Sequence, residues 1–287
     1  MSFGKKLGHT LLGLSPLPLS IAVQYMLMIP FFGILFAYCF RLYPDIYSVE
    51  FSDKLYDILN STTFNTVFLL TCAIFIIIFF GGWYFSAFEH LSLKPKHLKK
   101  ICSPLMLIGI FVLALGLQYT VSYIIAFTSS INPDWLTAFE ELSDSAGMND
   151  MTLLLVLYSV FLGPINEELL FRGVSLSHLC RAMPFWIANV IQAALFGIFH
   201  LNMLQGIYAF LLGLFFGYIR HVSKSIYPSM LLHIIYNFFA CFLTGILFYN
   251  ETSMFLICFR FILAVMLPIA GTFIFLTGIK NPQKQGE

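Results

Sequence analysis

The chain has 287 residues, of which 59% are hydrophobic and only 10% are charged, and its formal net charge is +1 at pH 7. A soluble domain carries about 25% charged residues, so this chain cannot cover a water-facing surface and lipid must be its solvent. The net charge says nothing about nucleic acid, but the sequence has no basic, aromatic-interleaved patch, so no nucleic-acid partner is expected.

The first apolar run follows Lys5 and Lys6, as a signal peptide would. It continues to about Phe40 without a small-residue cleavage site, which predicts a retained membrane anchor. The later apolar runs are continuous and not alternating, which predicts helices. A spanning helix needs about 20 apolar residues. In chain order the candidate spans are residues 19–40, 66–88, 104–128, 150–172, 185–201, 203–219, 226–248 and 254–276.

The predicted fold class is therefore all-α: a polytopic membrane protein with about eight transmembrane helices in one bundle. No repeat or linker divides the chain, so residues 1–287 are expected to form a single integral membrane domain. Gly213 and Gly217 form a GxxxG pattern that indicates close helix packing. Pro164 is expected to kink the fourth span.

Charged residues divide between the two sides of an eight-span count. One side holds the cations Lys5, Lys6, Lys94, Lys96, Lys99, Lys100, Arg172, Arg181, Arg220, Lys224, Lys280 and Lys284. The other side holds the acids Asp45, Glu50, Asp53, Asp57, Asp134, Glu140, Glu141, Asp144 and Glu251, with Arg41 and Lys54 as exceptions. The positive-inside rule then predicts a multi-pass protein of the cell membrane with both termini in the cytoplasm.

Ionisable residues are rare inside the spans, and such residues mark function by default. Glu168 and Arg172 are four residues apart, so they share a helix face and can form an ion pair. Glu167 points about 100° away and is free for a partner on another helix. The alternative is an interfacial charge cluster with no chemistry.

Two later spans carry further polar groups. His233 and Asn237 lie one turn apart in the seventh span, where they could present a pair of donors or simply hydrogen-bond between helices. His200 ends the fifth span, four residues after Phe196. The remaining histidines His90, His97, His178 and His221 are expected in solvated loops.

One glutamate, two histidines and an asparagine thus come from three separate helices. Glutamate and histidine are the residue types that activate a water for attack on a peptide carbonyl. A second histidine and an asparagine could stabilise the oxyanion that forms. The set indicates peptide-bond hydrolysis.

Three motifs in this order resemble those of a known family. Glu167-Glu168-Leu-Leu-Phe-Arg172, Phe196-Gly-Ile-Phe-His200 and His233-Ile-Ile-Tyr-Asn237 are similar to the EExxxR, FxxxH and HxxxN motifs of the CAAX prenyl endopeptidase and bacteriocin-processing (CPBP or Abi) family. The resemblance covers about residues 150–245, the expected protease core.

The resemblance implies an eight-helix intramembrane endopeptidase. Glu167 and His200 would activate the water, and His233 and Asn237 would form the oxyanion site. Glu168, Arg172 and Phe196 would support the site or contact the substrate. The implied partners are the lipid bilayer and a prenylated, membrane-anchored or leader-peptide substrate.

The mechanism stays open between two types. The chain lacks HExxH, the usual two-histidine zinc helix, which favours a site without a cofactor. A divalent metal such as zinc on Glu167, His200 and His233 remains the alternative, because two histidines and a glutamate are a known zinc ligand set.

The three motifs can form one site only if Glu167 and His200 lie at the same depth in the membrane. If the fourth span ends at Arg172, Glu167 lies about 7 Å from the cytoplasmic end, whereas His200 lies at the far end of its span. We therefore expect residues 173–184 to run along the membrane surface and residues 185–219 to form a tilted, partly inserted hairpin.

Two other functions remain to be weighed against a protease. The first is a non-enzymatic immunity or scaffold protein of the same fold, which would not need the complete Glu/His/His/Asn set. The second is a small proton-coupled transporter, for which the paired broken helices of many transporters are missing.

Overall fold

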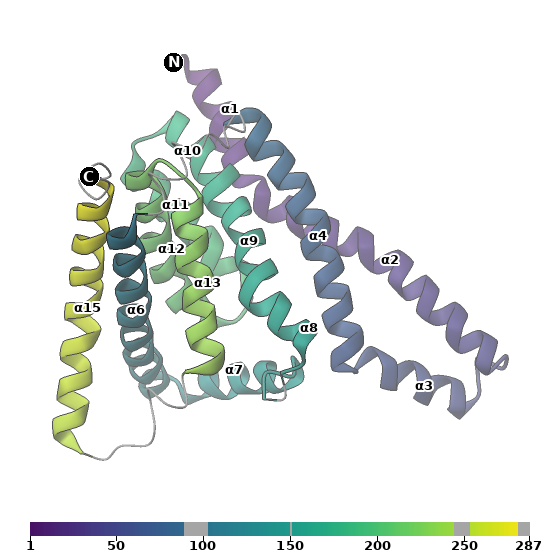
Figure 1. Ribbon diagram of the computed structural model, residues 1–287. Coiled ribbons are helices and arrows are strands. Elements are labelled where there is room, and N and C mark those ends of the chain that lie inside the picture. Colours follow the sequence, from purple (N-terminus) through teal and green to yellow (C-terminus); the bar gives the residue numbers. More distant parts are fainter. Residues whose placement is uncertain (89–102, 150, 244–252, 281–287) are drawn as a thin grey trace.

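The computed structural model describes residues 1–88, 103–149, 151–243 and 253–280, and throughout these ranges the regular elements are helices (Figure 1). The α-helices are α1 (Phe3–Leu14), α2 (Pro16–Leu42), α3 (Val49–Leu59), α4 (Thr62–Ala87), α6 (Pro104–Ile131), α7 (Pro133–Ser145), α8 (Leu153–Val156), α9 (Gly163–Glu167), α10 (Leu176–Ala182), α11 (Phe185–Phe199), α12 (Met203–Ser223), α13 (Tyr227–Phe242) and α15 (Met254–Lys280). Two π-helices, η1 (Leu157–Leu162) and η2 (Glu168–Ser175), flank α9. The all-α prediction is confirmed.

Polar caps fix where the apolar helices begin. Ser61 accepts a hydrogen bond from the backbone N–H of Phe64, and Ser103 accepts one from Met106. Asn202 caps α12 in the same way. Each cap satisfies one of the N–H groups that a helix start leaves without an intrahelical partner.

All eight predicted apolar runs are helical. Among the described residues, six helices are long and apolar enough to cross a membrane: Pro16–Leu42, Thr62–Ala87, Pro104–Ile131, Leu153–Ala182, Met203–Ser223 and Met254–Ile279. The other two, α11 and α13, are apolar but shorter. The predicted seventh span continued to residue 248, and its last part lies outside the described residues. The protein is thus an integral membrane protein.

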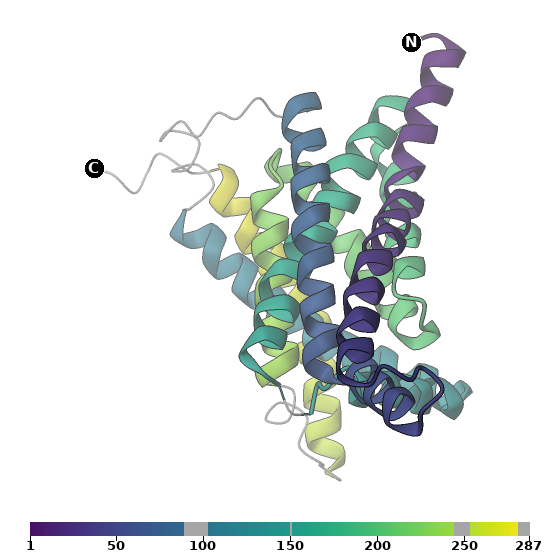
Figure 2. The same ribbon diagram turned by 90° about the vertical axis from the view of Figure 1, so that its right-hand side faces the viewer.

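The two ends of the bundle differ in charge. Figure 1 shows α3 and α7 lying across one end, with the N-terminus and the end of α15 at the other. The acids of α3 and α7 include Asp53, Asp57, Glu140 and Glu141. Figure 2 shows that α2 and α4 both run between these two ends, with α3 at the lower end of α2. The predicted cations Lys94, Lys96, Lys99, Lys100 and Lys284 and the acid Glu251 lie outside the described residues.

The fourth span differs from the prediction. We expected it to end at Arg172, but η2 and α10 continue the helix to Ala182. Arg172 is completely buried and is therefore not a loop cation. The segment 173–182 accordingly belongs to the same helix as Glu167, and the prediction that it runs separately along the surface is wrong. A buried ion pair explains the error, because pairing lets an arginine stay inside an apolar bundle.

Residues 185–219 form a hairpin as predicted, since α11 packs along α12, whereas its tilt and partial insertion in the membrane stay predictions. Gly213 and Gly217 make this packing possible. A Cβ on Gly213 would lie 2.9 Å from the Ala193 Cβ, and one on Gly217 would overlap the Asn189 side chain. The main core is shared by α4, α6, η2, α11, α12, α13 and α15.

Candidate active site

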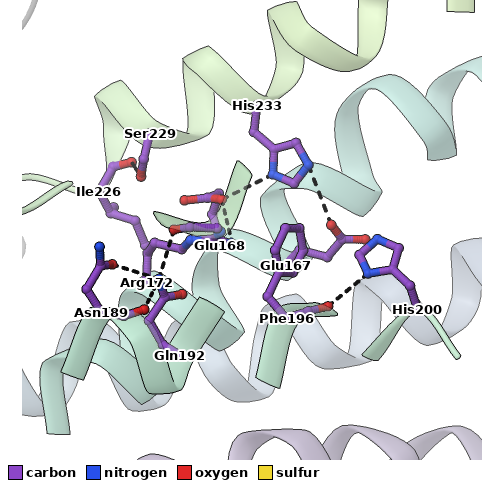
Figure 3. Close-up of polar contacts among 11 residues, drawn as sticks. Glu167, Glu168, Arg172, Asn189, Gln192, Phe196, His200, Ile226, Ser229 and His233 are labelled. Carbon is purple, nitrogen blue, oxygen red and sulfur yellow. Dashed lines mark hydrogen bonds and ion pairs between the residues drawn. The ribbon is translucent and has the colours of Figure 1, made fainter. Parts of the chain in front are cut away.

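The predicted site residues lie on three helical segments. Glu167 ends α9, and Glu168 begins η2. His200 is the C-cap of α11. His233 and Asn237 lie on α13. Figure 3 shows the carboxylates of both glutamates beside the His233 imidazole, with His200 near Glu167.

Glu168 and Arg172 form the predicted ion pair. The Arg172 Nη1 lies 3.0 Å from the Glu168 Oε1, and both side chains are fully buried. The guanidinium carbon also lies 4.3 Å from the Phe196 ring centre and 5.1 Å from that of Phe216. A desolvated cation over aromatic faces gains electrostatic energy from the ring quadrupoles. The pair therefore rests on η2, α11 and α12 together.

His233 contacts both glutamates. Its Nδ1 lies 3.1 Å from the Glu168 Oε1, and its Nε2 lies 3.5 Å from the Glu167 Oε2. A partner for Glu167 on another helix was predicted, and so was the pairing of Glu168 with Arg172. The additional contact of Glu168 with His233 was not predicted.

These contacts constrain where protons sit. Because a carboxylate accepts hydrogen bonds, the His233 Nδ1–H must donate to Glu168. The Nε2 of the same ring faces the Glu167 carboxylate, with 3.5 Å between Nε2 and Oε2.

His200 reaches the level of Glu167. The eight residues of η2 and the seven of α10 follow Glu167, and α11 then returns with 15 residues. The Phe196 ring centre lies 4.9 Å from that of His200 and 5.8 Å from that of His233. The Phe196 ring thus contacts the imidazole rings of both His200 and His233.

A short backbone contact fixes the His200 ring. Its Nδ1 lies 2.9 Å from the carbonyl oxygen of Phe196, so Nδ1 carries the hydrogen that is donated. The Nε2 of neutral His200 is then a free acceptor, as a general base requires. The next residue, Leu201, has φ of 53° and turns the chain towards α12.

Asn237 lies on the same helix as His233 but has a different partner. Its Nδ2 donates to the backbone carbonyl of Ser159 in η1, at 2.9 Å. The expected pairing of His233 and Asn237 as oxyanion donors is untested by this contact and stays a prediction.

Three side chains at the site were missed from the sequence. The ring centre of Phe216 lies 4.6 Å from that of His233. Gln192 donates to the Gly213 carbonyl at 2.9 Å and to the Asn189 Oδ1 at 2.8 Å. Asn189 and Gln192 are amides inside an apolar helix, and that signal could have identified them. Phe216 gave no such signal among 33 phenylalanines.

Two of the histidines expected in loops lie in helices. His178 is buried in α10, and its Nδ1 lies 3.0 Å from the Nδ1 of His9 on α1. His221 ends α12, and its ring stacks on Phe185 with 3.7 Å between ring centres. His178 was misplaced because the fourth span was ended too early. His90 and His97 lie outside the described residues.

The predicted metal alternative finds no preformed ligand set. Within the described ranges, no group of three or more His, Cys, Asp or Glu side chains is arranged to hold a metal ion. The Nδ1 of both histidines is hydrogen-bonded, which leaves their Nε2 atoms available, so the choice between a metal-dependent and a metal-free site stays a prediction.

Comparison with known proteins covers this same region. Residues 149–239 match the family described as type II CAAX prenyl endopeptidase Rce1-like. A protein of Bacillus subtilis (strain 168), described as "Putative membrane peptidase YdiL", is 28% identical over 86 residues. The match covers 30% of this chain, and the chain spans about a third (35%) of that relative's length. No solved structure matches. The family resemblance found in the three motifs is thereby confirmed.

Proposed function

Residues 149–239 carry an Rce1-like domain, and we propose that the chain is an intramembrane endopeptidase that hydrolyses a peptide bond with a water activated by Glu167 and His200. The contact of His233 with both glutamates carries this proposal. It places a carboxylate beside an imidazole in a largely buried cluster, and these are the groups that general acid–base chemistry needs.

Each residue takes one role in the reaction. The water lies between Glu167 and the free Nε2 of His200, which accept its proton as its oxygen attacks the scissile carbonyl carbon. The Nε2–H of His233 donates to the oxyanion, and Glu168 holds that ring in place through Nδ1. When the C–N bond breaks, the held proton goes to the leaving amine.

The substrate is proposed to be a prenylated or otherwise membrane-anchored peptide. An open groove of about 590 Å³ lies next to His200, lined by Gly197, Ile198, Leu201, Met203 and Phe210 among others. Its apolar lining at the α11–α12 turn suits an isoprenoid or acyl chain that arrives through the lipid. The family description supports a prenylated substrate.

The test uses the purified full chain in proteoliposomes with a quenched fluorescent peptide carrying a farnesylated cysteine near its C-terminus. Glu167→Gln, His200→Ala and His233→Ala are each expected to lower kcat about 100-fold or more. His221→Ala, a histidine outside the site, is the matched control and should cut at the wild-type rate. Equal cutting by all three site variants would contradict the protease function and favour an immunity or scaffold role.

Two further arms refine the proposal. The same peptide without its farnesyl group should be cut more slowly. Equal cutting rates for the two peptides would show that the protein does not recognise the prenyl group. We also propose that the site works without a metal ion. Activity should then survive a chelator, and loss of activity that added zinc restores would contradict this.

A further inference from the structure

Pro164 leaves one backbone carbonyl in this helix without its donor. The N–H of Gly163 donates to the carbonyl of Tyr158, five residues earlier, which is the π-helical register. In that register the next donor would be residue 164 and the next acceptor Ser159. Proline has no N–H, so the Ser159 carbonyl loses its helical hydrogen bond.

Asn237 fills this gap from another helix. Its Nδ2 donates to the Ser159 oxygen at 2.9 Å, which joins residues 78 positions apart in the chain. Inside a bilayer no water replaces a missing donor, and an unsatisfied carbonyl costs several kcal/mol. The hydrogen bond is therefore strongly favoured where it lies.

The same two helical segments meet at a second point. Glu167 follows Ser159 by eight residues, and His233 precedes Asn237 by four, so the Glu167–His233 contact and the Ser159–Asn237 bond are two separate points along the same pair of helical segments. Two contacts prevent one helix from rotating or sliding against the other, whereas a single contact still allows the helices to rotate about it.

We propose that Asn237 is a positioning residue that replaces the N–H missing at Pro164 and thereby holds Glu167 against His233. Pro164 and Asn237 then form a matched pair: the proline frees the carbonyl, and the asparagine uses it to join η1 to α13. The kinetic part of this inference rests on the proposed function, but the structural part does not.

The test restores the missing donor. Asn237→Ala, measured below its unfolding temperature, should lower kcat by up to about 100-fold with KM little changed, because the catalytic groups are misplaced. Adding Pro164→Ala supplies an N–H for the Ser159 carbonyl, so the double variant should recover most of the lost rate. Thermal unfolding in detergent should follow the same order, with Asn237→Ala lowering the Tm and the double variant restoring it.

A matched control and a second pair complete the design. Pro30, which lies inside α2, is replaced by alanine together with Asn237→Ala, and this pair should show no recovery. Pro164→Leu with Asn237→Ala supplies the same N–H with a larger side chain and should recover as Pro164→Ala does.

Lack of recovery in both rate and Tm would overturn the inference and indicate that Asn237 contacts the substrate directly. If the wild-type chain cuts no peptide, the proposed function fails, and the Tm series alone decides the role of Asn237.

Discussion

His233 contacts both of the adjacent glutamates and so couples their electrostatics. Glu168 holds its Nδ1, and Glu167 faces its Nε2. Arg172 neutralises Glu168 from within the same helix. A change in any of these four side chains therefore alters the surroundings of the His233–Glu167 contact.

Arg172 should be essential for folding because it compensates a buried carboxylate. Arg172→Met leaves Glu168 buried without its cation, and breaking such a pair costs about 3–5 kcal/mol. The free energy of unfolding, measured by denaturant titration in detergent, is expected to fall by this amount. Arg181→Met removes an exposed arginine from α10 and is the control, with an expected loss below about 1 kcal/mol. Equal losses in the two variants would show that the ion pair does not stabilise the fold.

The Glu168–Arg172 pair could be predicted from the sequence because its geometry is local to one helix. The contact of Glu168 with His233 could not, since it depends on how α13 packs against η2. The π-helices were also beyond prediction, because they depend on the register of the backbone hydrogen bonds and not on side-chain periodicity.

At the scale of elements, the α11–α12 hairpin carries His200 to the level of Glu167. Its two helices approach closely at Gly213 and Gly217, where Asn189 and Gln192 hydrogen-bond to the α12 backbone. The hairpin thus combines small residues with buried amides, the two devices that hold helices together in lipid.

Gly217→Ala tests this packing. The new Cβ would overlap the Asn189 side chain and lie 2.8 Å from the Gln192 Nε2, so a loss of about 1–3 kcal/mol in unfolding free energy is expected. Gly82→Ala in α4 is the matched control, because a Cβ there meets nothing within 4 Å and alanine favours the helix by about 0.5–1 kcal/mol. If both variants are equally stable, the close approach of α11 and α12 is not what the glycines provide.

The hydropathy pattern predicted helices at all eight apolar runs, but it placed the end of the fourth helix too early. Arg172, Ser175 and Ser177 look like a loop in sequence, yet all three are buried. Their polarity is compensated by contacts with other helices, such as the hydrogen bond from Ser175 to the Gly13 carbonyl at 2.6 Å. A single sequence does not show which groups on other helices will hydrogen-bond to these side chains.

At the scale of the whole molecule, charge separates the two ends of the bundle. The N-terminus lies at one end, and the acidic helices α3 and α7 lie at the other (Figure 1). Arg220 belongs to the first end, since its Nη2 donates to the hydroxyl of Ser177 in α10 at 2.9 Å. From the positive-inside rule we predict that this end faces the cytoplasm.

Cysteine labelling in intact cells tests this orientation. In a background with the native cysteines replaced by serine, Glu141→Cys in α7 should react with a membrane-impermeant maleimide added outside. Lys5→Cys and Lys224→Cys should react only after the cells are permeabilised. Labelling of Lys224→Cys from outside would reverse the orientation.

Residues from three helices that act as one hydrolytic unit should show kinetic losses that do not multiply. The most direct measurement is kcat for the farnesylated peptide with Glu167→Gln, with His200→Ala and with both together. Each single variant is expected to lose about 100-fold or more, and the double variant should lose no more than the worse single. Losses that multiply in the double variant, or near wild-type cutting by either single, would contradict a shared site.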